Sequence, residues 1–235
     1  ANTTGAGNTA VGYTTLDANT TGDNNTALGK SALTAVTTGA ENTAVGKSAL
    51  EACTGSDNAA IGLAAGNQVT TGSNNSFLGH DSGRTGSPGG AITTGSNEIC
   101  LGDENVTEAH IQVDWTIASD KRDKTDVSPL DLGLDFINQL EPVTYRWDKR
   151  SLYSEDQSVI PDGTHKEEKL EGGFLAQDVE VIEAQYGYKQ SDKTNLITNL
   201  SEDGMMYGIK YSKLVPMLTK AIQELSAKVE ALEKE

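Results

Sequence analysis

A serine and a lysine five residues apart, Ser119 and Lys124, form the pair in this sequence that could do chemistry. A serine hydroxyl becomes a nucleophile when a neutral amine takes its proton, and burial lowers the pKa of a lysine enough to supply such an amine. Asp120 and Arg122 lie between them and are expected to form a local ion pair or turn that supports the pair. A Ser-x4-Lys spacing arises often by chance, so the surrounding elements decide its meaning.

Two predicted elements flank the pair. Residues 110–118 alternate between polar and apolar side chains, which predicts a half-buried strand that presents the Ala118–Ser119 peptide bond at the start of a polar loop. Beyond the loop, Ser128 and Pro129 are typical of a helix N-terminus. A helix is predicted over residues 130–140, with Gly133 as a weak point. The apolar face of the strand would hold Ile111, Val113, Trp115 and Ile117.

Residues 1–102 are built from repeats. A fixed period of this size indicates a solenoid. Each unit holds a Thr-Thr-Gly turn and then a short strand of small and β-branched residues, which ends at a glycine able to take a positive φ. The first glycines of the units are spaced by 17, 17, 16, 17 and 23 residues, at Gly5, Gly22, Gly39, Gly55, Gly72 and Gly95.

Each repeat supplies few apolar side chains. Such a core is too thin for one chain to stand alone, so several copies, expected to be three, would wrap or stack together. Residues 84–90 interrupt the last period and are predicted to form an exposed loop, which is a candidate contact site for a surface ligand. The residues expected to face inward are Val11, Leu28, Val45, Ile61 and Leu78, with Leu16, Leu33 and Leu50 beyond the strands.

Residues 119–235 have the composition of an ordinary globular domain. Strands are predicted at residues 142–147 and 204–209, a strand that runs into a helix begins at residue 172, and residues 148–171 form an irregular charged excursion. The last segment has apolar residues spaced 4, 3, 4, 3, which is a heptad seam. A seam at this place favours a parallel trimer over a lone amphipathic helix. Its residues are Leu218, Ile222, Leu225, Val229 and Leu232.

The predicted fold class is therefore mainly β repeat followed by α+β. Residues 1–118 would form a trimeric β-solenoid or β-helix-like shaft. Residues 119–235 would form an α+β domain with a C-terminal trimeric coiled-coil helix.

The net charge of −16 is divided equally between residues 1–118 and 119–235. It argues against DNA or RNA as partners, which require a basic face, and against anionic lipid. No apolar run is long enough for a membrane span, and the first residues lack a signal pattern. His80, His110 and His165 lie in separate segments without metal-ligand spacing, so no metal or cofactor is expected. Cys53 and Cys100 are predicted to be buried thiols that form no disulfide.

Four motifs follow one another in residues 119–235. They are Ser119-Asp120-x-Arg122-x-Lys124, Leu140-Glu141-Pro142-Val143-x-Tyr145-x-Trp147, Gly173-Phe174-Leu175-Ala176-Gln177-Asp178-Val179 and Tyr211-Ser212-x-Leu214-Val215-Pro216-x-Leu218-x-Lys220-Ala221-Ile222-Gln223-Glu224-Leu225. Together they resemble the intramolecular chaperone domain of bacteriophage tail fibres and tailspikes, the peptidase S74 family. The 17-residue units are similar to repeats of phage fibre shafts.

The resemblance implies a domain that trimerises, brings three β-rich chains into register and then cuts itself off just before the serine. The scissile bond would be Ala118–Ser119, with Ser119 as nucleophile and Lys124 as general base. Asp123 stands where the family has an apolar residue, and its carboxylate would favour the charged amine of Lys124 and slow cleavage.

The resemblance also implies a place for the protein. The chain would be part of a virion tail fibre, assembled in the cytoplasm of the host bacterium, with itself as partner in a homotrimer. Residues 1–118 would be a site for a host cell-surface receptor or glycan. The alternative function is a structural, receptor-binding fibre tip whose terminal domain stays attached and uncut.

Overall fold

The computed structural model describes residues 2–154 and 157–234 and separates into two compact units. The repeat unit comprises residues 1–107, 146–169 and 200–207, and the helical unit comprises residues 108–145, 170–199 and 208–235. Two segments from the second half of the chain therefore pack with the repeats. The division expected at residue 118, as a boundary between two functions, stays a prediction.

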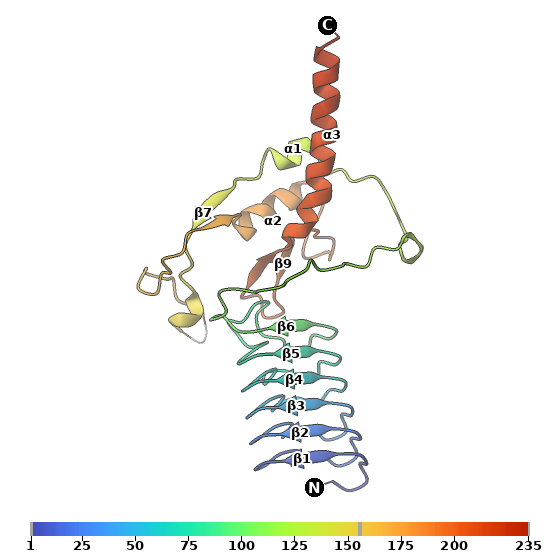
Figure 1. Cartoon of the computed structure of the whole chain (residues 1–235), viewed down its shortest axis with the longest axis vertical. Helices are drawn as coiled ribbons and strands as arrows, with labels where there is room; N and C mark the ends of the chain where they lie inside the picture. The colour runs from blue at the N-terminus through green and yellow to red at the C-terminus, as the bar shows by residue number, and fades with distance from the viewer. Residues whose placement is uncertain (1, 155–156, 235) are drawn as a thin grey trace. The chain divides into compact units, whose positions relative to one another are not determined.

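Within the described residues, the repeat unit holds six three-residue strands that pair in parallel and in chain order (Figure 1). Equivalent positions of successive repeats face each other, as Thr26 faces Thr43, so the period of the sequence sets the register. The predicted β-solenoid is confirmed. The strands are β1 (Thr9–Val11), β2 (Thr26–Leu28), β3 (Thr43–Val45), β4 (Ala59–Ile61), β5 (Ser76–Leu78) and β6 (Ile99–Leu101).

The inward positions predicted for the strands were wrong by one residue. Side chains alternate along a strand, so an error of one position exchanges the two faces. The predicted residues Val11, Leu28, Ile61 and Leu78 are 47–56% exposed, and Val45 is half-buried. The buried residues are instead the middle ones, Ala27, Ala44, Ala60, Phe77 and Cys100.

The small inward residues fit because leucines from the turns fill the interior. Leu16, Leu33 and Leu50 are buried as predicted, which leaves space for little more than a methyl group under strands β2 and β3. Further along, Gly66 and Gly83 stand where these leucines would recur, and Phe77 fills the space. A Cβ on Gly83 would lie 2.4 Å from the Phe77 ring. A large turn residue thus accompanies a small strand residue in the early rungs, and the reverse holds in the later rung, so that the interior stays filled.

A ladder of buried asparagines runs through the solenoid beside the strands. Each backbone N–H donates to the side-chain oxygen of the asparagine one rung earlier, at 2.9–3.0 Å. Each side-chain amide also donates to a glycine carbonyl of the next rung, at 2.8–2.9 Å. The ladder satisfies polar groups that the thin core would otherwise bury without partners. Its buried members are Asn25, Asn42, Asn58 and Asn75.

The glycine that ends each strand is required by both conformation and space. Gly46 has φ 140°, and a Cβ there would lie 2.1 Å from the carbonyl oxygen of Gly62 in the next rung. The predicted positive φ is confirmed. The loop at residues 84–90 is less exposed than predicted, because the Ser87 side chain is fully buried and its hydroxyl accepts a hydrogen bond from the Gly83 N–H.

The helical unit contains a small mixed fold around one core. The core residues are Leu132, Phe136, Val179, Ile197, Leu214 and Met217. Its strands β7 (Val143–Tyr145) and β8 (Glu171–Gly173) pair antiparallel, as the predicted strands at 142–147 and 172 require. Its helices are α1 (Leu134–Ile137), α2 (Ala176–Gln185) and α3 (Leu214–Leu232). Strands β9 (Thr198–Leu200) and β10 (Tyr207–Ile209) form another pair. Single 3-10 turns lie at Lys121–Asp123 and Tyr211–Lys213 in the helical unit and at Arg150–Leu152 in the repeat unit.

The helix predicted over residues 130–140 is shortened to α1, residues 134–137. Gly133, which has a low helix propensity, takes the N-cap position without a side-chain cap. The carboxylate of Glu224 on α3 supplies the missing acceptor, at 2.8 Å from the Leu134 N–H. The start of α1 is therefore set by a distant acidic residue and not by Ser128.

Candidate functional site

Ser119 and Lys124 are brought together in the helical unit. The Lys124 Nζ donates a hydrogen bond to the Ser119 Oγ at 2.5 Å. The 3-10 turn at Lys121–Asp123 makes this possible, because it folds the five-residue separation back on itself and ends with a hydrogen bond from the Lys124 N–H to the Lys121 carbonyl. The geometry is that of a nucleophile beside its base. The catalytic role of the two residues stays a prediction.

Asp120 and Arg122 stabilise this turn, as predicted. The Asp120 carboxylate accepts hydrogen bonds from the Arg122 N–H at 2.9 Å and from the Arg122 Nη2 at 2.6 Å. The hydrogen bond with the Arg122 side chain, followed by that with its backbone, lowers the pKa of Asp120. Asp120 is thus an ion-pair partner and N-cap of the turn.

The pair has the geometry for catalysis in this single chain but not the burial. Residues 108–129 are all exposed, including Ser119, Asp123 and Lys124. A general base must be unprotonated, a state that burial of an amine favours. Among the described residues, no ion pair joins Asp123 to Lys124, so the contact expected to slow cleavage is not formed.

The strand predicted over residues 110–118 is not formed, and the segment is irregular. Its apolar side chains are 52–73% exposed, namely Ile111, Val113, Trp115 and Ile117. The physical reason is that no strand in the described part of the chain pairs with it. The segment next to Ala118–Ser119 therefore presents an uncovered row of apolar residues.

Helix α3 has two apolar faces. Leu214, Met217 and Ala221 are buried in the helical unit, where α3 packs against α1. The seam predicted from the sequence lies on another face and is 45–70% exposed, at Leu218, Ile222, Leu225, Val229 and Leu232. The predicted helix is confirmed. The helical unit leaves the side chains of the seam exposed.

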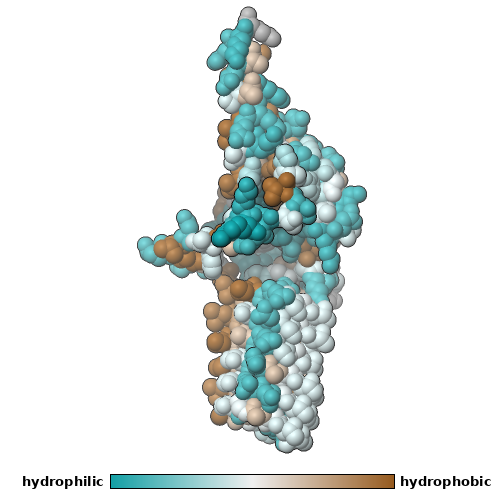
Figure 2. All heavy atoms as spheres, turned by 90° about the vertical axis from the view of Figure 1, so that its right-hand side faces the viewer, coloured by the Kyte–Doolittle hydropathy of each residue, from teal (hydrophilic) through white to brown (hydrophobic). Residues whose placement is uncertain are grey.

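The repeat unit also carries an apolar column. It is made by the outward residues at the ends of the strands, which stack one rung above another at Val11, Leu28, Val45, Ile61, Leu78 and Leu101. Figure 2 shows apolar residues gathered along one edge of the stacked rungs. The stacked side chains form a contiguous apolar surface, of a kind that monomeric proteins rarely expose.

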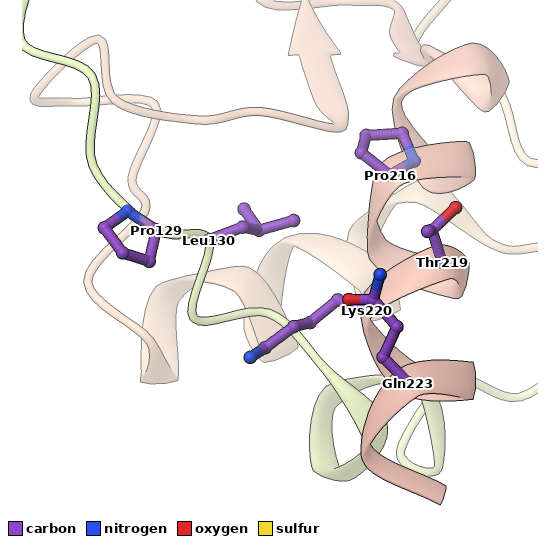
Figure 3. Close-up of a pocket in the computed structure, with 6 residues that line it drawn as sticks. All are labelled: Pro129, Leu130, Pro216, Thr219, Lys220 and Gln223. Carbon is purple, nitrogen blue, oxygen red and sulfur yellow. The ribbon is translucent and has the colours of Figure 1, made fainter. Parts of the chain in front are cut away.

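A shallow hollow lies elsewhere in the helical unit (Figure 3). Pro129 and Leu130 line one side, and the side chains of α3 line the other, at Pro216, Thr219, Lys220 and Gln223. Neither Ser119 nor Lys124 lines it. Because its lining contains neither of these two residues and no carboxylate, the hollow is not part of the candidate site.

The histidines and cysteines take structural places. The His80 Nδ1–H donates a hydrogen bond at 2.9 Å to the Asp103 carboxylate, which raises the pKa of His80. His110 lies beside Glu108. Among the residues described, no cluster of three potential ligands could hold a metal ion. Cys53 and Cys100 are buried free thiols in the solenoid core.

Comparison with known proteins gives one match. A family model described as chaperone of endosialidase, Peptidase_S74, matches residues 119–188. The match begins at the serine of the candidate site and supports a chaperone domain of this kind over residues 119–188. No curated protein and no solved structure matches the chain. Of the helices in the described residues, none has the length and apolar character that a membrane crossing requires.

Proposed function

We propose that residues 119–235 form a self-cleaving chaperone domain at the end of a phage tail fibre or tailspike. The domain brings three chains together, guides their repeats into register and then cuts the Ala118–Ser119 bond. The observation that carries the proposal is the 2.5 Å hydrogen bond between Lys124 and Ser119 at the first residue of the matched family segment. The mature fibre would be located in the virion, after assembly in the bacterial cytoplasm.

Cleavage follows from the positions of these two side chains. The neutral amine of Lys124 takes the Ser119 hydroxyl proton, and the Oγ attacks the carbonyl carbon of Ala118. The bond from that carbon to the Ser119 nitrogen breaks, and the nitrogen receives a proton to become a free amine. Water then hydrolyses the resulting ester. The products are an Ala118 carboxylate and a chain that begins with Ser119.

Self-association is supported by three apolar surfaces that the single chain leaves uncovered. They are the α3 seam, the column on the solenoid and the segment with Ile111 and Trp115. A 4, 3, 4, 3 spacing on a helix whose other apolar face is already buried is suited to a coiled coil. The resemblance to phage chaperone domains sets the expected number of chains at three.

Association also supplies what the site lacks. The exposed apolar residues Val113, Trp115 and Ile117 lead directly to Ala118–Ser119. When copies of the chain cover them, the neighbouring Ser119 and Lys124 lose water as well, which favours the neutral amine. Cleavage would therefore follow assembly, because only in the assembled protein would water be excluded from Ser119 and Lys124.

The experiment compares the masses of four purified full-length proteins under denaturing conditions. Wild type is expected to yield residues 1–118 and 119–235, whereas Ser119→Ala and Lys124→Ala stay intact. Lys121→Ala is the matched control, since Lys121 is an exposed lysine of the same turn whose side chain does not contact Ser119, and it is expected to cleave like wild type. Intact wild type after prolonged incubation under folding conditions would contradict self-cleavage.

The second candidate is an uncut, receptor-binding fibre tip. The exposure of Ser119 and Lys124 favours it. Residues 1–118 would then bind a host receptor or glycan while the terminal domain stays attached. The same mass measurement decides between the two candidates.

A further inference from the structure

Three Thr-Thr-Gly turns of the solenoid, which begin at Thr3, Thr20 and Thr70, are held by a threonine carbonyl of the next rung. The Thr20 carbonyl accepts hydrogen bonds from the N–H groups of Thr3 and Thr4, at 2.9 and 3.1 Å, and from the Thr3 hydroxyl at 2.8 Å. The Thr93 carbonyl does the same for the Thr70 N–H and hydroxyl, at 2.7 and 3.0 Å. At four steps of the stack, one threonine carbonyl oxygen thus accepts from two or more donors.

In the described part of the chain, no further rung supplies such an oxygen to the last turn, Thr93-Thr94-Gly95. The carboxylate of Glu202 accepts instead. It takes hydrogen bonds from the N–H groups of Thr93 at 3.0 Å, Thr94 at 3.1 Å and Gly95 at 3.1 Å, and also from the Thr94 hydroxyl. Its neighbour Asp203 accepts from the Ala91 N–H at 3.2 Å. Glu202 and the turn belong to the same compact unit.

The charge of Glu202 strengthens this arrangement. Burial alone would raise the pKa of Glu202, but the hydrogen bonds from the Thr94 hydroxyl and from the three amides outweigh it and lower the pKa to about 2. Hydrogen bonds to an ionised acceptor are stronger than those to a neutral carbonyl. The two acids that lie nearby are Asp203 and Glu98, and burial followed by the charge of Glu202 raises the pKa of Glu98.

We propose that residues 201–203 are a removable cap for the open end of the solenoid, in which the Glu202 carboxylate takes the place of the next rung's carbonyl. Repeat proteins require such ends to be closed, because a terminal rung has unpaired groups that an inner rung does not have. The cap comes from the part of the chain proposed to act as chaperone. Its removal would leave three N–H groups and a hydroxyl as a binding site for another carboxylate.

The part of this inference that concerns removal rests on the proposed function. If the Ala118–Ser119 bond is cut, the cap remains attached to the repeats only through noncovalent contacts such as those of Glu202 and Asp203. The chaperone domain would thus order the last rung during folding. When that domain departs, the rung would become free to bind another carboxylate.

The cap itself is tested by amide hydrogen exchange on the full chain carrying Ser119→Ala, so that cleavage plays no part in the result. Glu202→Ala is expected to speed exchange of the Thr93, Thr94 and Gly95 amides at least tenfold, and Glu202→Gln by a smaller factor, because an amide oxygen is a weaker acceptor than a carboxylate. Amides of β1 to β3 should keep the rates of the parent.

The matched control is Glu168→Ala, which removes an exposed carboxylate in the same unit and should change none of these rates. Unchanged exchange of the Thr93–Gly95 amides in Glu202→Ala would overturn the cap. Loss of protection throughout the repeats in both Glu202 variants would also contradict it, since a cap acts on the last rung first. Failure of the cap leaves the mass test of self-cleavage unaffected.

Discussion

Three glutamate carboxylates hold separate segments of the backbone in place by accepting hydrogen bonds from N–H groups. Glu202 holds the last solenoid turn, Glu224 starts α1, and Glu183 is fully buried. The Glu183 carboxylate accepts hydrogen bonds from the N–H groups of Leu196, Ile197 and Thr198 at 2.8–3.0 Å, as well as one from the Thr198 hydroxyl. Each acid supplies acceptors to amides of a turn or loop or of the first residue of a helix or strand, which would otherwise be unpaired.

None of these acids could be singled out from the sequence. Glu202 lies 107–109 residues from the amides it binds, and Glu224 lies 90 residues from Leu134. Their partners are mainly backbone N–H groups. Because nearly every residue has such a group, the sequence does not indicate which ones the acids will bind. By contrast, the pair of Ser119 and Lys124 was predictable, because a five-residue separation closed by a charged turn is local. Local chemistry can be predicted from sequence where distant backbone contacts cannot.

The stability of the last rung should depend on pH through Glu202. The pKa of Glu202 is lowered from 4.5 to about 2, so its ionised form stabilises the folded state above pH 4.5. That stabilisation is lost as the pH falls from 4.5 to about 2. In the Ser119→Ala chain, we expect the melting temperature of Glu202→Gln to lie below that of its parent at neutral pH, and the difference to shrink across this range.

Glu168→Gln serves as the control for this pH effect, because it makes the same charge change at an exposed position in the repeat unit. Its melting temperature should follow that of the parent at every pH. A difference between Glu202→Gln and its parent that stays constant from neutral to acid pH would show that the carboxylate charge has no part in stabilisation.

At the scale of elements, the repeats were predicted with the right period and the wrong inner face. The glycines and the Thr-Thr-Gly turns set the period and indicate where each strand ends. A strand of three residues, however, has too few positions for an alternating pattern to decide which side is buried. The strand predicted around Trp115 shows the converse, since the sequence alternates clearly there but no strand in the described part of the chain pairs with it.

The asparagine ladder should contribute strongly to the stability of the solenoid. Asn42→Ala would leave the Asn58 N–H and the Gly55 carbonyl without their partners inside the core. Each buried group left unpaired costs about 1–3 kcal/mol, so we expect the free energy of unfolding to fall by about 2–4 kcal/mol. Urea denaturation at a fixed protein concentration measures this change.

Lys47→Ala, at an exposed position five residues away, is the comparison for Asn42→Ala and should change the free energy of unfolding by less than about 0.5 kcal/mol. If the two variants were equally stable, the ladder would be a consequence of the stacking and not one of its causes.

At the scale of the whole molecule, the proposed self-association would cover the exposed apolar surfaces of the chain. Leu225 lies in the middle of the α3 seam and is half exposed, so an aspartate there would place a charge in any interface that the seam forms. We expect Leu225→Asp to prevent assembly and to leave the repeats monomeric or aggregated. Analytical ultracentrifugation of the full chain measures the outcome.

Ala227→Asp introduces the same charge on the exposed side of α3 away from the seam and should assemble like wild type. A soluble, correctly folded trimer formed by Leu225→Asp would count against a chaperone that acts through this helix.

In the proposed function, the chains assemble first and cut themselves afterwards. Native mass spectrometry of the purified wild-type protein tests both parts in one sample, because it reports how many chains a particle holds and whether each is whole. We predict particles that contain three chains, each cut into residues 1–118 and 119–235. A stable, folded particle made of one uncut chain would contradict the account.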